Sequence, residues 1–278
     1  MPDSGELAQV AELIREVAAA ELLPRFRNLS KDDVRQKRPG DLVTVADVAS
    51  EQRLASGLAK ILPGVPVVGE EAVEADAGLL DLIGRPGERC WIVDPLDGTS
   101  NFAAGKATFA IIVALVADRQ TVGGWILDVP NGRMAVALAG QGVTLDGAAV
   151  IGTPPGGSPS GFVGYKIRKA FERQLPAARR RGIGPVSTLR CAGVEYLEIL
   201  AGRATFSIYR RTKPWDHAAG ALMLAEAGGG AVRFDGKDYA PDQQTDAGII
   251  SAPSRQALVD VLAAFESLEL PLLQPMED

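Results

Sequence analysis

The strongest constraint on this chain is a six-residue segment at 94–99, DPLDGT, that directly follows the apolar run WIV at 91–93. A buried strand ending at Asp94 would present its carboxylate at the edge of a sheet, where open α/β sheets bind ligands. Pro95 keeps Asp94 extended, because the residue before a proline avoids the α region. Asp97 can then turn back towards the same point. The alternative is an ordinary Asp-Gly turn followed by a helix cap.

This segment and the residue after it supply the groups of a metal and phosphate site. The two carboxylates, with the Leu96 carbonyl between them, are hard oxygen ligands that suit Mg²⁺, which also binds water and substrate phosphate. Gly98, Thr99 and Ser100 offer backbone N–H groups and hydroxyls to an anion at the start of a helix. We therefore expect a cation and a phosphate to bind side by side here.

Two further acidic segments support this expectation. Glu70 and Glu71 follow the apolar run at 65–68, and one of them can reach a site at the strand end because neighbours on an extended chain point to opposite faces. Asp216 precedes a helix of small residues at 218–227. The alternatives are a solvated acidic loop for the glutamates and an aspartate placed on a helix dipole for Asp216.

Four segments carry a resemblance to a known family. They are DLVTVAD at 41–47, GEE at 69–71, WIVDPLDGTSNF at 91–102 and PWDHAAGALMLAEAGG at 214–229. In their order and spacing the chain resembles the inositol monophosphatase family of Mg²⁺-dependent, lithium-sensitive phosphatases. The resemblance implies an α/β (α+β) fold, a layered α-β-α-β-α sandwich of the sugar phosphatase type, with two or three Mg²⁺ ions per active site. We also expect a homodimer.

The same resemblance assigns roles to individual residues. The implied metal ligands are Glu70, Asp94, the Leu96 carbonyl, Asp97 and Asp216. The implied substrate-binding residues include Gly98, Thr99, Ser100 and Asp216. The implied catalytic residues are Asp47, Glu70, Asp94, Asp97, Thr99 and Asp216. Asp47 would pair with Thr99 and help to orient the attacking water, although Thr44 and Asp47 also form a capping-box pattern at a helix start, which leaves a purely structural role open.

Composition limits the cellular setting and the partners. A formal charge of −6, from 35 acidic against 29 basic residues, argues against nucleic-acid binding. Bound cations would explain an acidic surplus in an enzyme for phosphate esters. Two cysteines, Cys90 and Cys191, cannot form a disulfide framework, and no apolar run approaches the ~20 residues of a membrane span. We expect a soluble cytoplasmic protein with a small phosphorylated substrate and no membrane partner.

Basic residues are concentrated in two places. The first group is expected on a solvated helix face and contains Lys166, Arg168, Lys169, Arg173, Arg179, Arg180 and Arg181. The second group, Arg210, Arg211 and Lys213, lies just before Asp216. It either borders the active site, where it would steer anionic ligands, or lies outside it.

The residue inventory limits the possible chemistry. His217 is the only histidine, which excludes multi-histidine zinc or iron sites and histidine-phosphorylating phosphatases. The closest enzymatic alternative is an aspartyl-phosphate phosphatase, in which a strand-end aspartate attacks phosphorus. That mechanism uses a second aspartate two residues later, whereas Asp97 comes three residues after Asp94. Direct hydrolysis by a metal-activated water is favoured. A regulatory or binding protein on the same fold is the alternative of a different class.

Substrate identity depends on two residues. Family members that are specific for inositol carry a glutamate just upstream of the Trp-Asp motif, and the position that aligns with it here is Tyr209. Glu195, in an unusual loop, either supplies this missing carboxylate as a substrate-binding residue or faces solvent. Fructose bisphosphate, nucleotide phosphates and histidinol phosphate stay open as substrates.

Hydrophobic patterning predicts alternating helices and strands. In the first half we expect helices at 7–18 and 44–62, strands at 65–68, 90–93 and 109–116, and a hairpin of 121–128 with 133–138. A Gly/Pro-rich linker at 152–159 divides the chain into an N-terminal α+β domain at 1–151, which carries the metal-binding motifs, and a C-terminal α/β domain at 161–278, which completes the active site. In the second half we expect a strand near 162, a basic helix to 181, a strand at 186–190, a helix at 194–200, a strand at 204–209, and helices after 215 and from 254.

Overall fold

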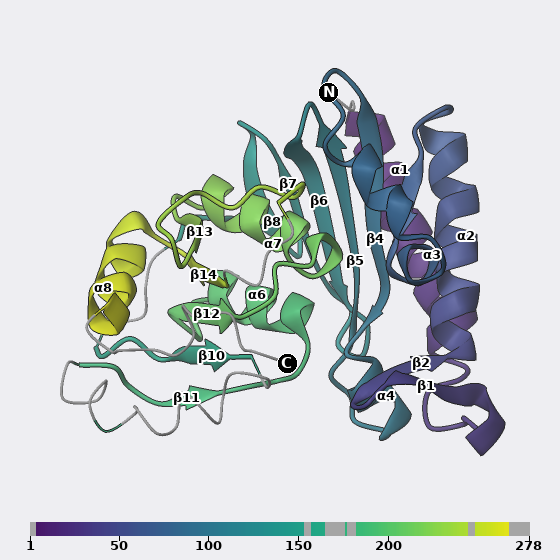
Figure 1. Ribbon diagram of the computed structural model, residues 1–278, viewed down its shortest axis with the longest axis horizontal. Helices are drawn as coiled ribbons and strands as arrows, with labels where there is room; N and C mark the ends of the chain where they lie inside the picture. The colour runs from purple at the N-terminus through teal and green to yellow at the C-terminus, as the bar shows by residue number, and fades with distance from the viewer. Residues whose placement is uncertain (1–3, 153–156, 165–175, 177–181, 244–247, 267–278) are drawn as a thin grey trace.

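Two β-sheets separated by a layer of helices organise the fold (Figure 1). The computed structural model describes residues 4–152, 157–164, 176, 182–243 and 248–266. These residues form five layers, which run in Figure 1 from α1 and α2 on the right, through the first sheet, α6 and α7, and the second sheet, to α8 on the left. The expected α-β-α-β-α sandwich is confirmed.

Among the described residues the first sheet has seven strands, in the order β3-β4-β5-β6-β7-β8-β9. The first pair is parallel and every later pair is antiparallel. A separate hairpin, β1 with β2, precedes the sheet. The strands are β1 (Val34–Arg38), β2 (Asp41–Thr44), β3 (Val67–Gly69), β4 (Arg89–Asp97), β5 (Ala110–Ala117), β6 (Gln120–Asp128), β7 (Arg133–Leu138), β8 (Gly142–Leu145) and β9 (Ala148–Val150).

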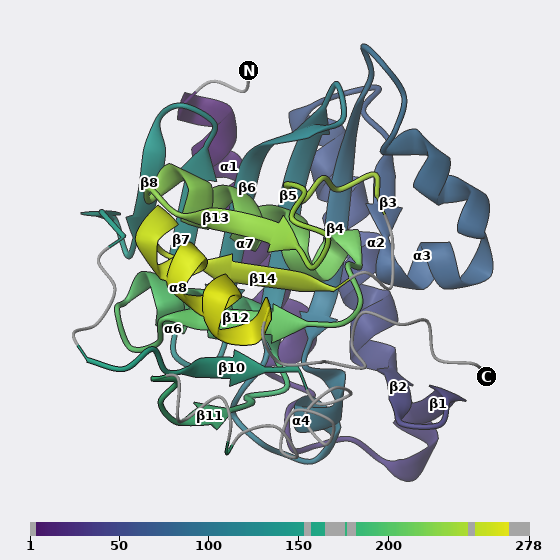
Figure 2. The same ribbon diagram turned by 60° about the vertical axis from the view of Figure 1, so that its left-hand side comes forward.

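The second sheet has five strands in the same part of the chain, in the order β11-β10-β12-β14-β13. Figure 2 shows this sheet and α8 in front of the first sheet. β10 lies parallel to β11 and β12, and the remaining pairs are antiparallel. The strands are β10 (Gly161–Val163), β11 (Val186–Ser187), β12 (Phe206–Tyr209), β13 (Gly230–Arg233) and β14 (Ile249–Ala252).

The α-helices supply the three helical layers and the short elements near the site. Those described are α1 (Ser4–Val17), α2 (Val45–Ile61), α3 (Glu70–Ala75), α4 (Thr99–Ala103), α6 (Ala192–Leu200), α7 (Pro214–Glu226) and α8 (Arg255–Glu266). A π-helical turn at Ala18–Leu22 extends α1, and 3-10 turns lie at Lys31–Asp33 and Ala77–Leu82. No helix among the described residues is long and apolar enough to cross a membrane.

Alternation along β4 explains why helices cover both faces of the first sheet. Trp91 and Val93 pack with α1 and α2 in one core cluster, whereas Ile92 packs with residues of α6 and α7 in another. Successive side chains of a strand point to opposite faces. A continuous apolar run therefore needs a cover on each side, which is typical of sheets buried on both faces.

Most of the predicted elements are confirmed, and the exceptions are short. Residues 70–75 form α3 rather than an extended chain end or loop. Only residues 186–187 of the strand expected at 186–190 pair with a neighbouring strand. The strands β1, β2, β8, β9, β13 and β14 were not predicted. The basic helix expected up to residue 181 lies outside the described residues, apart from residue 176. The linker residues 153–156 lie outside them as well.

The two sheets use separate stretches of the chain. Strands up to Val150 build the first sheet and strands from Gly161 onward build the second. We propose that the expected division between residues 151 and 161 separates two domains that share the α6 and α7 layer.

Candidate active site

A β-bulge in β4 brings two aspartates to one face of the first sheet. Asp94 pairs with Ile112 and Asp97 with Ala110, so three steps along β4 match two along β5. Without the extra residue Asp97 would point to the opposite face, because side chains alternate. β4 thus continues through Asp97, and the expectation that the strand ends at Asp94 is wrong. Pro95 lies in the irregular stretch, where its missing N–H breaks no ladder.

The bulge is held by hydrogen bonds to both carboxylates. Asp94 Oδ1 accepts from the backbone N–H of Leu96 at 3.0 Å. Asp97 Oδ2 accepts from the Gly193 N–H at 2.6 Å and from Cys191 Sγ at 3.1 Å, both at the start of α6. Asp94 is 2% exposed and Asp97 9% exposed. Both carboxylates are therefore fixed in a nearly water-free position.

A tight turn after β4 requires glycine. Gly98 has φ +89°, and a Cβ at this position would lie 3.0 Å from the Thr108 carbonyl oxygen. The turn leads into α4, where Thr99 Oγ1 lies 3.0 Å from Asp47 Oδ1 and 2.9 Å from the Leu96 carbonyl oxygen. The expected contact between Asp47 and Thr99 is present. One hydroxyl proton can serve only one of these two acceptors at a time.

Asp47 also caps α2, so its two proposed roles coexist. Its Oδ2 accepts from the Thr44 N–H at 2.8 Å and from Thr44 Oγ1 at 2.6 Å, which completes the capping box. The other oxygen, Oδ1, is the one that meets Thr99. Burial raises the pKa of Asp47 to about 6, although the hydrogen bonds from Thr44 and Thr99 oppose this rise.

Glu70 and Asp216 reach the same cleft from other elements. Glu70 opens α3, directly after β3, which is the parallel neighbour of β4. Asp216 lies in the first turn of α7, behind Pro214 at the helix start. Burial raises the pKa of Asp94, and the charges of Glu70, Asp97 and Asp216 raise it further. Burial also raises the pKa of Asp216, against the opposing effect of Lys213.

Lys213 contributes a positive charge in direct contact with this carboxylate cluster. Its Nζ lies 3.0 Å from Glu70 Oε1 and over the Trp215 ring, 5.2 Å from the centroid. Burial alone would lower the pKa of Lys213, but the charges of Asp216 and Glu70 outweigh it and raise the pKa. The ammonium group therefore stays charged and offsets part of the negative charge.

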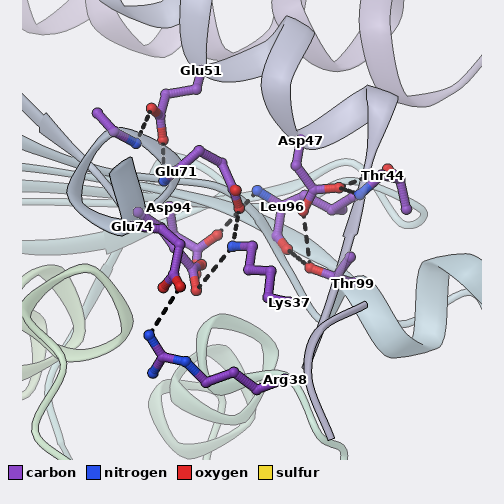
Figure 3. Close-up of polar contacts among 12 residues, drawn as sticks. Lys37, Arg38, Thr44, Asp47, Glu51, Glu71, Glu74, Asp94, Leu96 and Thr99 are labelled. Carbon is purple, nitrogen blue, oxygen red and sulfur yellow. Dashed lines mark hydrogen bonds and ion pairs between the residues drawn. The ribbon is translucent and has the colours of Figure 1, made fainter. Parts of the chain in front are cut away.

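The β1–β2 hairpin holds the start of α3 (Figure 3). Lys37 Nζ lies 2.5 Å from Glu71 Oε1 and 4.0 Å from Glu70 Oε1. Arg38 pairs with Glu74 one turn later, at 2.9 Å. Burial raises the pKa of Glu71 to about 7, although Lys37 lowers it. The hairpin thus contributes a second cation beside the carboxylate cluster.

α2 supports α3 from the opposite side. Glu51 accepts the backbone N–H groups of Glu71 and Ala72, each at 2.8 Å, as Figure 3 shows for its carboxylate. These are donors that the first turn of a helix leaves without an internal partner. Gly69 is required at this junction, because a Cβ there would overlap the Glu51 carboxylate.

The donor set fits a hard cation. Among the described residues, no three His, Cys, Asp or Glu side chains lie close enough together to enclose a metal ion as they stand. The cleft nevertheless offers carboxylate oxygens and the Leu96 carbonyl. Burial raises the pKa values of Asp94 and Asp97, and the charge of Glu70 raises both further. Oxygen donors with an excess of negative charge are the environment that Mg²⁺ prefers.

Nearly all the predicted site residues line one cleft of about 240 Å³. Arg210, Arg211 and Lys213 border it, which settles the open question about this basic group. The predicted residues that line it are Glu70, Asp94, Leu96, Asp97, Gly98, Thr99, Ser100, Tyr209 and Asp216. Asp47 lies behind Thr99.

Glu195 is the exception. Its side chain is 0% exposed and is not part of the cleft lining, so the alternative in which it faces solvent is wrong. Its carboxylate accepts from Tyr209 Oη instead, so the two residues weighed as substrate ligands bind each other. Any effect of Glu195 on a substrate must pass through a neighbouring residue.

Sequence reasoning missed several residues that shape the site. Lys37 gave no signal, because a lysine on an edge strand is usually a solvated charge. Glu51 and Asn101 also went unnoticed; Asn101 Nδ2 donates to the Thr108 and Leu189 carbonyls, which ties α4 to the chain before α6. His217 is buried and packs against α6, with Nδ1 3.1 Å from Tyr196 Oη. Both cysteines are buried and free.

Comparison with known proteins decides the family. The family model described as "Inositol monophosphatase family" matches residues 3–269. The chain belongs to the inositol monophosphatase family. The resemblance carried by the four sequence segments is thereby confirmed, and the chain is a phosphoric monoester hydrolase, a phosphatase of the sugar phosphate type within a metal-dependent family.

Relatives within this family cover most of the chain. The inositol-1-monophosphatase of Mycobacterium leprae is 31% identical over 245 residues, 81% of this chain and 83% of the relative. The fructose-1,6-bisphosphatase/inositol-1-monophosphatase of Thermotoga maritima is 28% identical over 211 residues, 73% of this chain and 76% of the relative. The crystal structure of extragenic suppressor protein suhB from Bartonella henselae shares the fold, with TM-score 0.79 at 22% identity, covering 95% of this chain and 100% of that one.

Proposed function

We propose that the protein is a Mg²⁺-dependent phosphatase that hydrolyses a small phosphate monoester with water as the nucleophile. One observation carries this proposal: the acidic side chains of Glu70, Asp94, Asp97 and Asp216 border the same cleft as the Gly98–Ser100 turn. A reaction of this kind depends on positioning and charge stabilisation more than on a strong protein nucleophile.

The carboxylates and the Leu96 carbonyl would together hold two or three Mg²⁺ ions. When bound, Mg²⁺ activates a water molecule and stabilises the negative charge on the leaving ester oxygen. The backbone N–H groups and hydroxyls of Gly98, Thr99 and Ser100 would bind the phosphate.

Asp47 and Thr99 would handle the proton of the attacking water. Thr99 Oγ1 can donate to Asp47 Oδ1 and accept from a water in the cleft at the same time. Burial holds the pKa of Asp47 at about 6, near the working pH of a cellular enzyme, which suits a group that takes up a proton through Thr99.

The aspartyl-phosphate alternative would make Asp94 the nucleophile. Against it, Asp94 Oδ1 already accepts from the Leu96 N–H and the carboxylate is 2% exposed. Direct attack by water leaves no phosphorylated protein. Rapid quenching during turnover, followed by mass spectrometry, should find no acyl phosphate, and a phosphorylated Asp94 would favour the alternative.

The charge-removing variants Asp94→Asn, Asp97→Asn and Asp216→Asn test the proposal. Each keeps the side-chain shape and removes one ligand charge, so we expect each purified, folded variant to lose at least about 100-fold in kcat/KM in the presence of Mg²⁺. Glu198→Gln is the control, because its carboxylate pairs with Arg133 and Arg203 away from the cleft. Undiminished activity in any aspartate variant would remove that residue from the site. Hydrolysis after exhaustive chelation would contradict the Mg²⁺ requirement.

We also propose that myo-inositol 1-phosphate is a poor substrate. Tyr209 occupies the position at which inositol-specific relatives carry a glutamate that binds the inositol hydroxyls. The nearby Arg210 and Arg211 favour a substrate with a second anionic group, and the Tyr209 ring favours a substrate with a planar group. The informative measurement is kcat/KM for inositol 1-phosphate against fructose 1,6-bisphosphate and a nucleotide phosphate. A preference of about tenfold or more for inositol phosphate, roughly 1.4 kcal/mol in transition-state binding, would contradict this assignment.

The remaining properties follow from the family and are part of the same proposal. We infer inhibition by Li⁺ at millimolar order, a homodimer, a cytoplasmic location, and no nucleic-acid or membrane partner. Hydrolysis assays at low Mg²⁺ with added Li⁺ and light scattering of the purified protein measure the first two. A regulatory or binding role without catalysis would appear as Mg²⁺ binding with no turnover of any ester tested.

A further inference from the structure

Glu195 is a buried acidic side chain that the proposed mechanism does not use. It lies in the first turn of α6 and is 0% exposed. Its Oε1 accepts from the Leu189 N–H at 2.7 Å and from Thr188 Oγ1 at 3.2 Å, and its Oε2 accepts from Tyr209 Oη. A buried carboxylate is tolerated when donors surround it in this way.

The donors connect two walls of the cleft. Tyr209 lines the cleft from the end of β12, and Thr188 and Arg190 line it from the turn that precedes α6. These walls belong to different elements, and the Glu195 carboxylate touches both. It therefore fixes the distance between them.

The turn before α6 needs such a support. Arg190 has φ +57°, a left-handed conformation that is unfavourable for a non-glycine residue. The Arg190 N–H donates to Thr188 Oγ1 at 3.1 Å, and Asn101 Nδ2 donates to the Leu189 carbonyl at 2.8 Å. Strained backbone persists where surrounding contacts over-determine it. Glu195 is one of those contacts.

The ring of Tyr209 is held at its other side by His217, with ring centroids 4.9 Å apart in an edge-to-face arrangement. His217 Nε2 lies 3.0 Å from the Arg211 carbonyl, which can only accept, so Nε2 carries the proton. Nδ1 then accepts from Tyr196 Oη at 3.1 Å. Tyr209 and the chain that follows it are thereby fixed between α6 and α7.

We propose that Glu195 is a positioning residue that holds Tyr209 and the 188–190 turn in place, and so shapes the part of the cleft that receives the organic portion of the substrate. The inference rests on the proposed phosphatase function. Glu195 itself does not touch the substrate. Its effect is to present the phenol of Tyr209, and no carboxylate, at this wall.

Four variants separate positioning from direct contact. Glu195→Ala removes the acceptor, Glu195→Gln preserves its shape, and Tyr209→Phe removes the donor but keeps the ring. Glu198→Gln is the matched control, one turn later on α6 and paired with arginines. For each, KM and kcat are measured with the preferred ester and with 2-glycerophosphate, together with the inhibition constant of inorganic phosphate.

We expect Glu195→Ala to raise KM for the preferred ester by about tenfold or more, because three partly buried donors lose their acceptor. Its kcat and the inhibition constant of inorganic phosphate should change by less than about threefold, a difference below 1 kcal/mol, because the Gly98–Ser100 turn is untouched. Glu195→Gln should keep KM within the same limit, since its amide oxygen accepts from Leu189 and its amide nitrogen donates to Tyr209. The double variant Glu195→Ala with Tyr209→Phe should be no worse than the Glu195→Ala single variant, which is the sign of a shared interaction.

Two kinetic outcomes would overturn the proposal. If Glu195→Gln is as impaired as Glu195→Ala, the charge itself acts on the substrate. If the effects of Glu195→Ala and Tyr209→Phe add, the two residues do not act through each other.

A second measurement does not depend on turnover. Amide hydrogen exchange in residues 186–191 should be faster in Glu195→Ala than in the wild type, because the turn loses its acceptor, and unchanged in Glu198→Gln. Unchanged exchange in Glu195→Ala would refute the positioning role. If the wild type hydrolyses no phosphate ester, the proposed function fails, and this exchange measurement still decides the role of Glu195.

Discussion

At the scale of single residues, burial determines the chemistry of the carboxylates, and Glu195 offers a direct test of this. Burial raises the pKa of Glu195 from 4.5 to about 7, although the hydrogen bonds from Tyr209 and Leu189 oppose the shift. The folded state therefore holds this proton more tightly than the unfolded state. The stability that the proton contributes is complete below about pH 4.5 and is lost as pH rises through 7.

We predict that the free energy of unfolding of the wild type falls by roughly 2–3 kcal/mol more than that of Glu195→Gln between pH 5 and pH 8. Urea unfolding at the two pH values measures the difference. Glu198→Gln should keep the wild-type pH dependence, because its two arginine partners lower the pKa of Glu198 and the group stays ionised throughout this range. Parallel curves for wild type and Glu195→Gln would show that Glu195 is not buried as described.

The site aspartates were predictable from sequence because short-range chemistry positions them. Asp94, Asp97 and Gly98 lie in one strand-and-turn segment, and both aspartates reach the cleft although the strand continues through a bulge to Asp97. The Tyr209–Glu195 bond joins residues of two elements through tertiary packing, so no local pattern indicated it. Lys37 reaches the site for the same reason, through the placement of a whole hairpin.

At the scale of elements, the approach of α7 to its neighbours depends on small residues. A Cβ at Gly220 would overlap the Tyr196 ring of α6, and a Cβ at Gly124 of β6 would lie 3.1 Å from the Ala219 Cα. These glycines allow α7 to pack closely against both α6 and the first sheet. Asp216, at the start of α7, is positioned by this packing.

We predict that Gly220→Ala destabilises the protein by roughly 1–3 kcal/mol, although alanine is the better helix former by about 1 kcal/mol. Thermal or urea unfolding measures the change. In a Tyr196→Leu background the same substitution should lose most of its effect, because the smaller side chain leaves room for the methyl group. A stabilising effect in the wild-type background would mean that α6 and α7 are further apart.

Elements with strong periodicity were predicted well, whereas several short strands were missed. α2 and the β6–β7 hairpin have long apolar patterns and clear turn or cap signals. β13 and β14 have four residues each, and their extended structure depends on pairing with strands that are far away in the sequence. Propensity is a weak guide where tertiary pairing decides the structure.

At the scale of the whole molecule, the proposed metal site joins separate parts of the chain. Asp94 and Asp97 belong to the first sheet, Glu70 to α3, and Asp216 to α7. A cation bound by all of them would connect the sheet to the central helical layer. Binding to the folded state alone stabilises it by mass action.

We predict that Mg²⁺ at about 100 times its dissociation constant raises the melting temperature by roughly 5–10 °C, from about 2.7 kcal/mol of binding linkage. Ca²⁺-free, Mg²⁺-free protein serves as the reference in differential scanning fluorimetry. The shift should shrink in Asp97→Asn and persist in Glu198→Gln. An equal shift in all three proteins would place the stabilising cation elsewhere.

The central position of α6 and α7 has a consequence for co-translational folding. The core cluster between the first sheet and these helices combines Ile92, Ile112 and Ile126 with Leu197, Met223 and Ala227. Synthesis from residue 151 to residue 227 takes roughly 4–15 s at ordinary elongation rates. During that interval one apolar face of the nascent first sheet is not yet covered by α6 and α7. A chaperone that shields this face during synthesis should therefore raise the yield of folded protein.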